Sequence, residues 1–353
     1  MEFDYIIIGQ GICGTFLSWN LFKAGKKILV IDEPQRFSST KVASGIINPV
    51  TGRRVVTTWM IEDLLPFAWN TYTAFGQDIG ETIIEQKNTV AFPPSAQMLQ
   101  TYEKRATEPN AFIQRSTENE DQFHQWFNFA FHSYVINPTY LIYLHPFLNG
   151  WRKKLTEINS LLEEKFDEAQ LIIHEDSVQY KTITAKKIIF CNGVNTFQNA
   201  YWKNLPFVFN KGQALIADIP NLSANDIYKY GAVTLAPWYN SLWWIGSSYE
   251  NDFATTEPTE DFYNSTVTSL QTILKIPFTI KEHFASLRPA VIERRPFVGL
   301  HPVHPSLGIF NGMGTKGSSL APYFAHQLTQ NLLNNIPIDP LADVKRFHRM
   351  LSK

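Results

Sequence analysis

The sequence is poor in cysteine, with only Cys13 and Cys191 among its 353 residues. Both lie inside apolar segments, and two cysteines are too few for the disulfide framework of a small secreted domain. We therefore expect two buried, reduced side chains and a cytoplasmic protein. The cysteines and the nine histidines show no spacing typical of a metal site, so we predict no bound metal.

An excess of charge and a long apolar run are missing too. The formal net charge is −1, so no overall positive field predicts binding to nucleic acid. No apolar run reaches the roughly 18 residues that a transmembrane helix needs, and we expect no membrane span. The first predicted strand begins by Phe3, and this start leaves no room for a signal peptide.

What the sequence does have is the material for a large core. Hydrophobic residues make up 44% of the chain and charged residues 18%, a balance that argues against long disordered segments. A length of 353 residues indicates about two domains. We find no internal repeat and no low-complexity segment.

Residues 5–32 form the most informative stretch of the sequence. An apolar run, Tyr5–Ile8, leads into three glycines, and a helical pattern then connects to a second apolar run that ends at Asp32. The glycines of such a strand–turn–helix unit allow a tight turn, close approach to a pyrophosphate and packing of the helix on the strand. The helix N-terminus presents free N–H groups to the phosphates. The predicted dinucleotide contacts are Gly9, Gly11, Ile12, Gly14 and Asp32.

Asp32 narrows the choice of dinucleotide. A carboxylate after the second strand accepts hydrogen bonds from a ribose hydroxyl and repels a 2′-phosphate, so FAD or NAD fits better than NADP. Three glycines alone also mark ordinary turns. The flanking strands and helix are what favour the dinucleotide site over a plain turn.

The rest of the chain predicts a second, sheet-rich region. Short strand-like runs at 213–219, 231–237 and 241–249 favour an antiparallel sheet. Alternation along such strands would allow only one face of Trp238, Tyr239, Trp243 and Trp244 to reach a pocket. We further expect a helix over 55–75, a helical pattern over 139–151 that Pro146 bends or ends, and a last helix over 318–333 with Pro322 in its first turn.

Four separated blocks carry a family resemblance. The first three are the glycine motif, SSTKVASGIINP at 38–49 and KKIIFCNG at 186–193. The fourth, C-terminal block has two parts, SLRPAVIERRPFVG at 286–299 and GIFNGMGTKGSSLAP at 308–322. Together they resemble the D-amino-acid-oxidase (DAO) family of FAD enzymes, in its glycine and sarcosine oxidase branch. They are also similar to the oxidase half of the bifunctional enzyme that modifies wobble uridine in tRNA.

The resemblance implies an α/β (α+β) fold with a Rossmann-like FAD-binding domain and a second, antiparallel-sheet substrate domain. Both domains would be discontinuous: 1–75, 135–205 and 285–353 for FAD, and 76–134 and 206–284 for substrate. FAD would be held without a covalent bond, because the cysteine that sarcosine oxidases carry near the C-terminal turn is absent here. The further cofactor contacts that it implies are Ser39, Thr40, Ser44, Gly45, Gly193, Gly312, Gly314, Thr315, Lys316 and Gly317.

The resemblance also implies a substrate site. Arg288 matches an arginine that binds the substrate carboxylate, although it would also fit a structural pair with Glu293. Lys316 matches a carboxylate-binding lysine, and its alternative is an ordinary turn lysine. Arg53 and Arg54 follow the flavin loop, where only one of them could point inward and a surface role fits both. Tyr249 aligns with a position that lines the pocket.

Two departures from the family put simple glycine oxidation in doubt. A carboxylate-binding tyrosine is Thr234 here, and an arginine near the C-terminal turn is Thr315. The resemblance thus predicts an FAD-dependent enzyme that oxidises the C–N bond of an amine or amino acid bearing a carboxylate, with O2 or another acceptor taking the electrons. Cleavage of a carboxymethylaminomethyl group on tRNA is one alternative, not favoured by the charge balance. A flavin-binding protein without turnover is the other.

Overall fold

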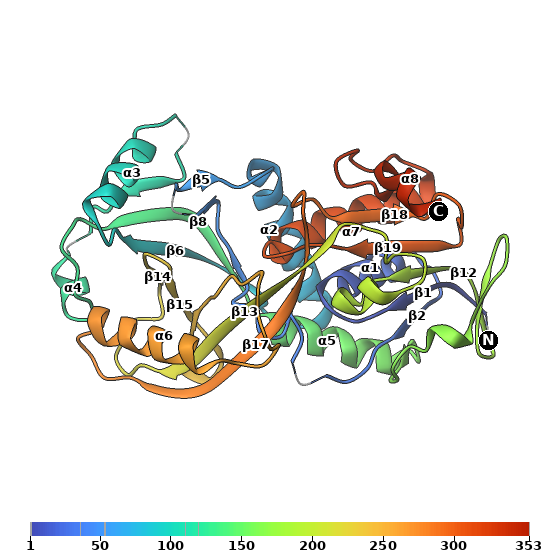
Figure 1. The fold of residues 1–353 in the computed structure, drawn as a ribbon, viewed down its shortest axis with the longest axis horizontal. Helices are drawn as coiled ribbons and strands as arrows, with labels where there is room; N and C mark the ends of the chain where they lie inside the picture. Colours follow the sequence, from blue (N-terminus) through green and yellow to red (C-terminus); the bar gives the residue numbers. More distant parts are fainter. Residues whose placement is uncertain (1, 36, 53, 110, 119, 353) are drawn as a thin grey trace.

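The protein has two lobes, each built around its own β-sheet (Figure 1). The computed structural model describes residues 2–35, 37–52, 54–109, 111–118 and 120–352. The chain passes between the lobes several times, and both of its ends lie in the lobe that contains α1 and α8 (Figure 1). The helices are α1 Ile12–Lys23, α2 Ile61–Ile79, α3 Ala96–Ala106, α4 Asp121–His124, α5 Leu144–Glu157, α6 Glu260–Ile273, α7 Gly317–Asn334 and α8 His348–Leu351.

The first sheet, which has eight strands within the described residues, has a parallel centre in the order β9–β2–β1–β12–β19. A hairpin of β10 and β11 and the antiparallel strand β18 extend it. Its strands are β1 Glu2–Ile8, β2 Ile28–Ile31, β9 Leu161–Leu162, β10 Leu171–Ile173, β11 Val178–Tyr180, β12 Ile183–Phe190, β18 Phe297–Leu300 and β19 Leu307–Asn311.

The parallel strands are apolar throughout because both faces of this sheet are buried. Along β1, Tyr5 and Ile7 pack into a cluster with α1, α2, α5 and α7. Ile6 and Ile8 alternate to the opposite face and pack with Trp202 and neighbouring apolar residues. The parallel sheet with helices on one face confirms the predicted Rossmann-like half of the fold.

The second sheet has nine strands within the described residues, in the order β17–β13–β16–β15–β14–β6–β8–β3, with β7 beside β8. Every neighbouring pair is antiparallel except β14 and β6. The strands are β3 Ile46–Ile47, β6 Ile84–Phe92, β7 Ile113–Arg115, β8 Tyr134–Ile142, β13 Phe207–Asp218, β14 Ile227–Tyr230, β15 Val233–Pro237, β16 Trp243–Gly246 and β17 Thr279–Val291. A separate hairpin joins β4 Val50–Thr51 to β5 Val56–Thr57.

Strand alternation divides this sheet into two functional faces. Trp243 and Ile245 of β16 turn to the core that α6 covers. Trp244, between them, turns to the opposite face, where its indole N–H donates to the carbonyl of Val42 at 3.0 Å. This arrangement confirms that only one face of the tryptophan pair reaches the region between the lobes.

Helix α2 begins later than the sequence pattern predicts. The expected start near residue 55 falls in a run of β-branched residues, and Val56 and Thr57 instead pair with the strand Val50–Thr51. β-Branched side chains lose rotamer freedom in a helix and favour a strand. The helix starts at Ile61, with two acidic residues in its first turn, and ends at Gly80 in the left-handed conformation.

The helical pattern predicted over 139–151 is wrong in its first half. Residues 139–142 belong to β8, and Pro146 neither bends nor ends the helix but lies in the first turn of α5. Proline fits there because the first N–H groups of a helix have no partner within the helix. Residues 139–142 form a strand because they pair with β6, which is distant in the sequence. The local sequence pattern carries no information about this pairing.

The position of Pro322 also needs correction. It is the sixth residue of α7, so it lies in the second turn rather than in the first. Because proline has no N–H, the carbonyl of Ser318 one turn earlier lacks its helical donor. The hydroxyl of Tyr72, from α2, donates to that carbonyl at 3.0 Å. Tyr72 is fully buried, and this bond therefore joins α2 to α7 at the centre of the molecule.

We expect Tyr72→Phe to lower the free energy of unfolding by about 1 to 3 kcal/mol, because it leaves the half-buried Ser318 carbonyl unpaired. Pro322→Ala would supply an N–H to the same carbonyl. In urea unfolding, the double variant should therefore lose less free energy of unfolding than the sum of the losses in the two single variants. Additive losses would show that the hydroxyl does not compensate for the proline.

Sheet membership cuts across the predicted domain boundaries. Strand β8, Tyr134–Ile142, pairs within the second sheet, as does β3, although the prediction assigned 1–75 and 135–205 to the FAD domain. Strand β17 likewise continues to Val291, past the predicted boundary at 285. The division itself stays a prediction. No helix within the described residues is both long and apolar enough to cross a membrane.

Candidate functional site

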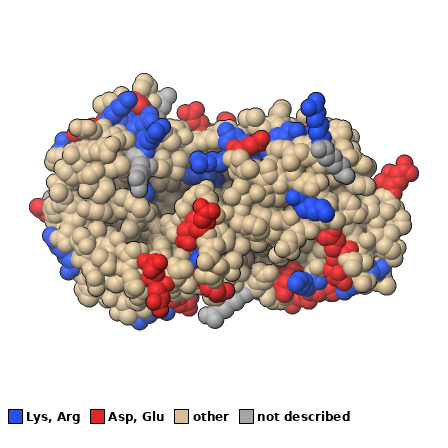
Figure 2. All heavy atoms as spheres, in the orientation of Figure 1, with Lys and Arg blue, Asp and Glu red and all other residues tan. Residues whose placement is uncertain are grey.

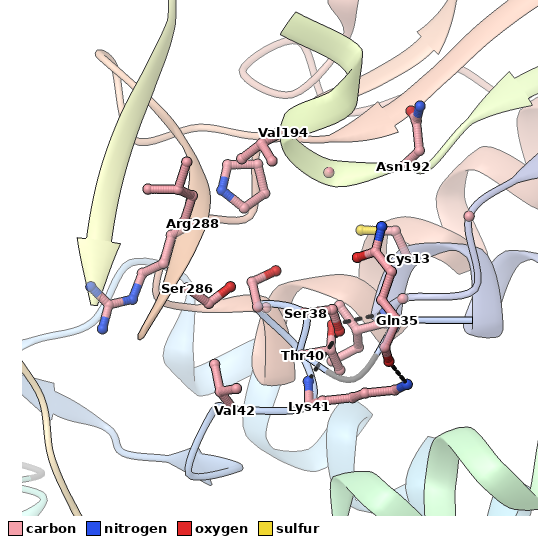
Figure 3. A pocket seen from close by; sticks show the side chains of 18 of the residues that line it. Cys13, Gln35, Ser38, Thr40, Lys41, Val42, Asn192, Val194, Ser286 and Arg288 are labelled. Atoms are coloured by element: carbon pink, nitrogen blue, oxygen red, sulfur yellow. Dashed lines mark hydrogen bonds between the residues drawn. The ribbon is translucent and has the colours of Figure 1, made fainter. Parts of the chain in front are cut away.

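A cavity of about 810 Å³ lies between the glycine turn of the first lobe and the second sheet. Figure 2 shows the molecular surface hollowed where the two lobes meet. Inside the cavity, Figure 3 shows Arg288 and Ser286 of β17 at one side and Cys13 and Asn192 at the other, with Thr40 beside them. Segments from every predicted block therefore meet around one space.

The glycine turn is closely packed. Gly9 has a φ of +94°, and a Cβ there would lie 2.8 Å from the Cα of Asn192. A Cβ on Gly14 would lie only 1.8 Å from the carbonyl oxygen of Gly9. Helix α1 can therefore approach the end of β1 only if both positions are glycine.

The N-terminus of α1 opens on this cavity. The first helical bond runs from the Thr15 N–H to the carbonyl of Gly11 at 2.9 Å, so the preceding N–H groups have no helical acceptor. The Ile12 N–H donates to the hydroxyl of Thr40 at 3.2 Å. Gly11, Ile12 and Thr40 line the cavity, where these groups and the helix dipole favour an anion.

Asp32 lies at the end of β2, as predicted, but its carboxylate already has protein partners. One oxygen accepts from the N–H of Gln10 at 2.8 Å, and the other pairs with the guanidinium of Arg152 at 2.8 Å. Arg152 also donates to Gln10 and pairs with Glu163. A carboxylate has about four acceptor sites, so a ribose hydroxyl still has a place on Asp32.

Arg152 and Gln10 are residues that the sequence reasoning missed. Both line the cavity, and Arg152 contacts Asp32 from a position 120 residues further along the chain. Its carboxylate partners raise the pKa of Arg152 although burial opposes them. Arginine is common in amphipathic helices, so the sequence around Arg152 does not indicate its contact with Asp32.

The remaining predicted cofactor positions fall into two groups. Within the described residues, those that line the cavity are Ser39, Thr40, Ser44, Gly193, Gly314, Thr315 and Gly317, besides the residues of the glycine turn. Gly45, Gly312 and Lys316 lie outside the lining. Gly45 and Gly312 instead shape turns, with φ of +77° and +80°, and a Cβ on Gly45 would lie 2.1 Å from the Ile142 carbonyl.

The C-terminal turn brings α7 to the cavity. The Gly314 N–H donates to the carbonyl of Pro289 at 3.0 Å, which fixes the turn against β17. Asn311 donates to the carbonyl of Gly193 at 2.8 Å and so joins this turn to the end of β12. Helix α7 begins at Gly317, and its N-terminus therefore lies at the cavity wall.

Arg288 makes no salt bridge to a carboxylate in the described part of the chain, although Glu250 lies close enough to raise its pKa. Its guanidinium donates to Asn210 at 2.6 Å, to the Ser248 carbonyl at 3.1 Å and to Ser247 at 3.0 Å. Within the described residues, Arg346 and not Arg288 pairs with Glu293, so the expected structural pair with Glu293 is wrong. Burial lowers the pKa of Arg288, which stays cationic because arginine titrates far above neutral pH.

Gly212 makes room for this arginine. The guanidinium lies across the β13 backbone, where a Cβ on Gly212 would be 2.0 Å from one of its nitrogens. Strand β13 pairs in register with β17, with Asn210 opposite Arg288. A buried asparagine, a glycine and two serines thus hold one cation on the cavity wall.

Lys316 precedes α7 and is half-buried. Its ammonium lies 3.4 Å from the hydroxyl of Thr58, and no carboxylate pairs with it within the described residues. Burial, with repulsion from Lys229, lowers its pKa to about 8. Lys229 is a further residue that the sequence reasoning missed.

Other predicted site residues lie elsewhere. Tyr249 is 57% exposed and outside the cavity lining, although it is close enough to Arg288 to raise the pKa of that residue. Arg54 is exposed, and Arg53 lies outside the described residues. No group of three or more His, Cys, Asp or Glu in the described part of the chain could hold a metal ion.

Comparison with known proteins identifies the family. Residues 4–331 match the family described as FAD dependent oxidoreductase (DAO), which is most of the chain. The protein belongs to this family. It is therefore an FAD-dependent oxidoreductase, and both the predicted cofactor and the predicted resemblance are confirmed.

Solved structures of the same fold cover nearly the whole chain. Iminodiacetate oxidase from Chelativorans sp. BNC1 has a TM-score of 0.77 at 17% identity, covering 96% of this chain and 98% of its own. Glycine oxidase from Bacillus cereus ATCC 14579 has a TM-score of 0.78 at 14% identity, covering 95% and 96%. L-α-Glycerophosphate oxidase from Mycoplasma pneumoniae, solved with FAD bound, has a TM-score of 0.72 at 14% identity, covering 96% and 97%. At these identities the likeness shows the fold, and it confirms the predicted fold class.

The cavity has the chemistry that FAD requires. The N-terminus of α1 offers unpaired N–H groups for the pyrophosphate, and Asp32 offers acceptors for the ribose. A Cβ on Gly193 would meet no atom within 4 Å, so this turn opens on free space. The N-terminus of α7 would favour the negative charge that reduction places on a flavin.

The two cysteines also border the FAD cavity but are poor nucleophiles. Cys13 and Cys191 are 7% and 5% exposed. Burial raises the pKa of both thiols well above the usual value, which keeps them protonated at neutral pH. Since the thiolate is the reactive form, this burial supports the predicted non-covalent attachment of FAD.

Proposed function

We propose that this enzyme oxidises the C–N bond of an amine that carries a carboxylate. The observation that carries the proposal is Arg288, a cation on the cavity wall whose protein partners are all neutral. An arginine presents paired N–H donors that match a carboxylate. A buried cation whose hydrogen-bond partners are all neutral favours an anionic ligand, and a carboxylate so bound would lie on the FAD cavity.

In the proposed reaction the substrate carbon loses its C–H bond with both electrons, the nitrogen loses a proton to solvent and a C=N bond forms. FAD, when bound, would supply the oxidising power for this loss of a hydride. Water then adds to the imine and releases a carbonyl compound and an amine. Two electrons finally pass to O2 or another two-electron acceptor, which with O2 gives hydrogen peroxide.

The protein's own contribution is positioning. Arg288 would hold the carboxylate, and the half-buried Lys316 would add a second positive charge on the side of α7. Neither group takes part in bond breaking. Orientation of this kind accounts for much of an enzyme's rate when the cofactor supplies the chemistry.

The test is the visible spectrum of the purified holoenzyme under anaerobic conditions. Sarcosine, other N-substituted glycines and D-amino acids should bleach the flavin, whereas the same amines with the carboxylate converted to an amide should not. The carboxymethylaminomethyl group of wobble uridine is itself an N-substituted glycine, so the panel includes tRNA carrying it. Bleaching by amides as fast as by acids would overturn the role of the carboxylate.

Binding of a carboxylate should weaken as the pH rises through about 8, the pKa of Lys316. Its folded pKa lies below the usual 10.5, so Lys316 is cationic below about pH 8 and neutral above it. The thioether diacid HOOC–CH2–S–(CH2)3–COOH is a suitable probe because it has no amine to titrate and its second carboxylate can extend from Arg288 towards Lys316. Its dissociation constant should rise by up to roughly 10-fold between about pH 7 and pH 9, since a charge-assisted hydrogen bond contributes ~1.5 kcal/mol.

The matched control for this titration is Lys316→Arg, whose cation persists to much higher pH. Its dissociation constant should change much less through pH 8. A flat profile in the unaltered protein would show that Lys316 does not contact the carboxylate. The same shift predicts that, between about pH 8 and 10.5, folding stability rises with pH, because the unfolded chain binds the extra proton.

A further inference from the structure

Two half-buried lysines, Lys229 and Lys316, have no acidic partner within the described residues. Lys229 of β14 lies near enough to Lys316 for its charge to lower the pKa of that residue. Burial lowers the pKa of Lys229 itself. Within the described residues, the one polar contact of the pair is the hydroxyl of Thr58, 3.4 Å from the Lys316 ammonium.

The register of the second sheet shows which way Lys229 faces. Directly paired residues follow one another across the strands in a single row, which reads Phe284, Ala214, Gly246, Thr234, Lys229 and Ala91. Side chains in such a row share one face of the sheet. Phe284 and Ala214 line the cavity, and the neighbours Tyr228 and Leu235 turn to the core under α6. Lys229 therefore lies on the cavity face, beside Thr234.

Two neighbouring, half-buried ammonium groups cost free energy unless an anion joins them. Each has lost part of its hydration, and each repels the other. Figure 2 shows Lys and Arg side chains gathered at the upper margin of the hollow between the lobes, whereas acidic side chains lie mostly below it. A site that keeps two such charges fits a ligand that brings a negative charge of its own.

Arg288 and Lys229 are too far apart to share one carboxylate. The Arg288 guanidinium lies over Gly212 of β13, and three strand spacings separate β13 from β14 in the sheet. At about 4.8 Å a spacing, this separation is roughly 14 Å, of which the lysine side chain spans only a part. Several bonds of a ligand would be needed to reach from one cation to the other.

We propose that the substrate carries a second carboxylate, held by Lys229 and Lys316, several bonds from the carboxylate that Arg288 binds. This inference rests on the proposed function and narrows its substrate class to amines with two acidic ends. Thr234 belongs to the same arrangement, because it pairs directly with Lys229 across the neighbouring strands and shares its face of the sheet.

The binding test uses two thioethers that FAD does not oxidise as amines: HOOC–CH2–S–(CH2)3–COOH and its analogue with the distal acid converted to an amide. Calorimetric titration of the holoenzyme should show that the diacid binds at least roughly 10-fold more tightly, because each charge-assisted hydrogen bond contributes ~1.5 kcal/mol or more. Lys229→Met should abolish this preference by weakening only the diacid. Lys281→Met, which removes an exposed lysine of the same sheet, should leave the preference unchanged.

A stability measurement separates a ligand-binding lysine from a structural one. Removing an uncompensated, half-buried charge should leave Lys229→Met as stable as the unaltered protein or more so, and Lys229→Arg should keep the diacid preference. Loss of stability in both variants would mean that the lysine serves the fold, which would overturn the proposal. Equal binding of diacid and amide by the unaltered protein would overturn it as well.

The corresponding amines test the reaction separately. N-(Carboxymethyl)-4-aminobutyrate should bleach the flavin at lower concentrations than sarcosine does. The two amines could bleach the flavin at the same concentrations, and Lys229→Met could leave both concentrations unchanged. In that case the proposed function holds and the second carboxylate site is wrong. If carboxylate-bearing amines of neither kind bleach it, the proposed function is wrong, whatever the thioethers show.

Discussion

Replacement of Gly14 by alanine is expected to weaken FAD binding about 100-fold or more, so that the purified protein is largely colourless. The added Cβ would lie 1.8 Å from the Gly9 carbonyl oxygen and 3.4 Å from the Cβ of Cys191. Helix α1 would have to move away from β1, which would displace the N–H groups that face the pyrophosphate. Overpacking of this kind costs about 1–3 kcal/mol, and backbone contacts are at the upper end of that range. Fluorescence titration of the apoprotein with FAD measures the loss.

Gly25→Ala is the matched control for this prediction. Gly25 needs a left-handed backbone, with a φ of +72°, whereas Gly14 is helical; but a Cβ on Gly25 would meet no atom within 4 Å. The variant should lose only about 1 kcal/mol of stability from backbone strain and should keep its FAD. Normal FAD affinity in Gly14→Ala would show that α1 can move without disturbing the site.

Arg288→Ala is expected to lower the rate of flavin reduction per unit of substrate concentration by about 100- to 1,000-fold for carboxylated amines. Truncating one partner of a hydrogen-bonded charge pair typically costs 2–5 kcal/mol, much of it from the charge left unpaired. FAD binding should not change, because the guanidinium contacts Asn210, Ser247 and Ser248 on the second sheet. Anaerobic stopped-flow reduction at several substrate concentrations measures the effect.

Gly212→Ala provides a second route to the same result. The alanine Cβ would occupy the place of the Arg288 guanidinium, at 2.0 Å from one nitrogen, while the strand backbone tolerates the residue. The variant keeps the charge but moves it, so carboxylate affinity should fall although the arginine is intact. Unchanged reduction rates in both variants would place the carboxylate elsewhere in the cavity.

The strand–glycine turn–helix of residues 2–23 could be predicted from the sequence because its parts are neighbours in the chain. The closeness of Gly9 and Gly14 is a local constraint, and an apolar strand on each side completes the signal. Family blocks further along the chain identified the cofactor. The predicted site positions themselves remain predictions, although the structure brings most of them to one cavity.

The sequence-based predictions were wrong where contacts with segments remote in the sequence decide the local conformation. Residues 139–142 have a helical pattern but pair with β6, and the β-branched residues before α2 form a hairpin. Pro322 was expected in the first turn of α7, where proline fits a helix, but it lies in the second turn and leaves the Ser318 carbonyl without a helical donor. Tyr72, from another helix, supplies the missing donor.

The sequence by itself thus determined the fold class, the family and FAD, because these depend on short motifs whose residues act through local geometry. Only the tertiary structure decided which charges are paired. Arg152 pairs with Asp32, 120 positions away in the chain. Arg346 pairs with Glu293, and Arg288 is hydrogen-bonded to neutral partners instead. The sheet register places Lys229 beside Thr234. Charge pairing depends on distances between segments that are remote in the chain, and no local pattern contains those distances.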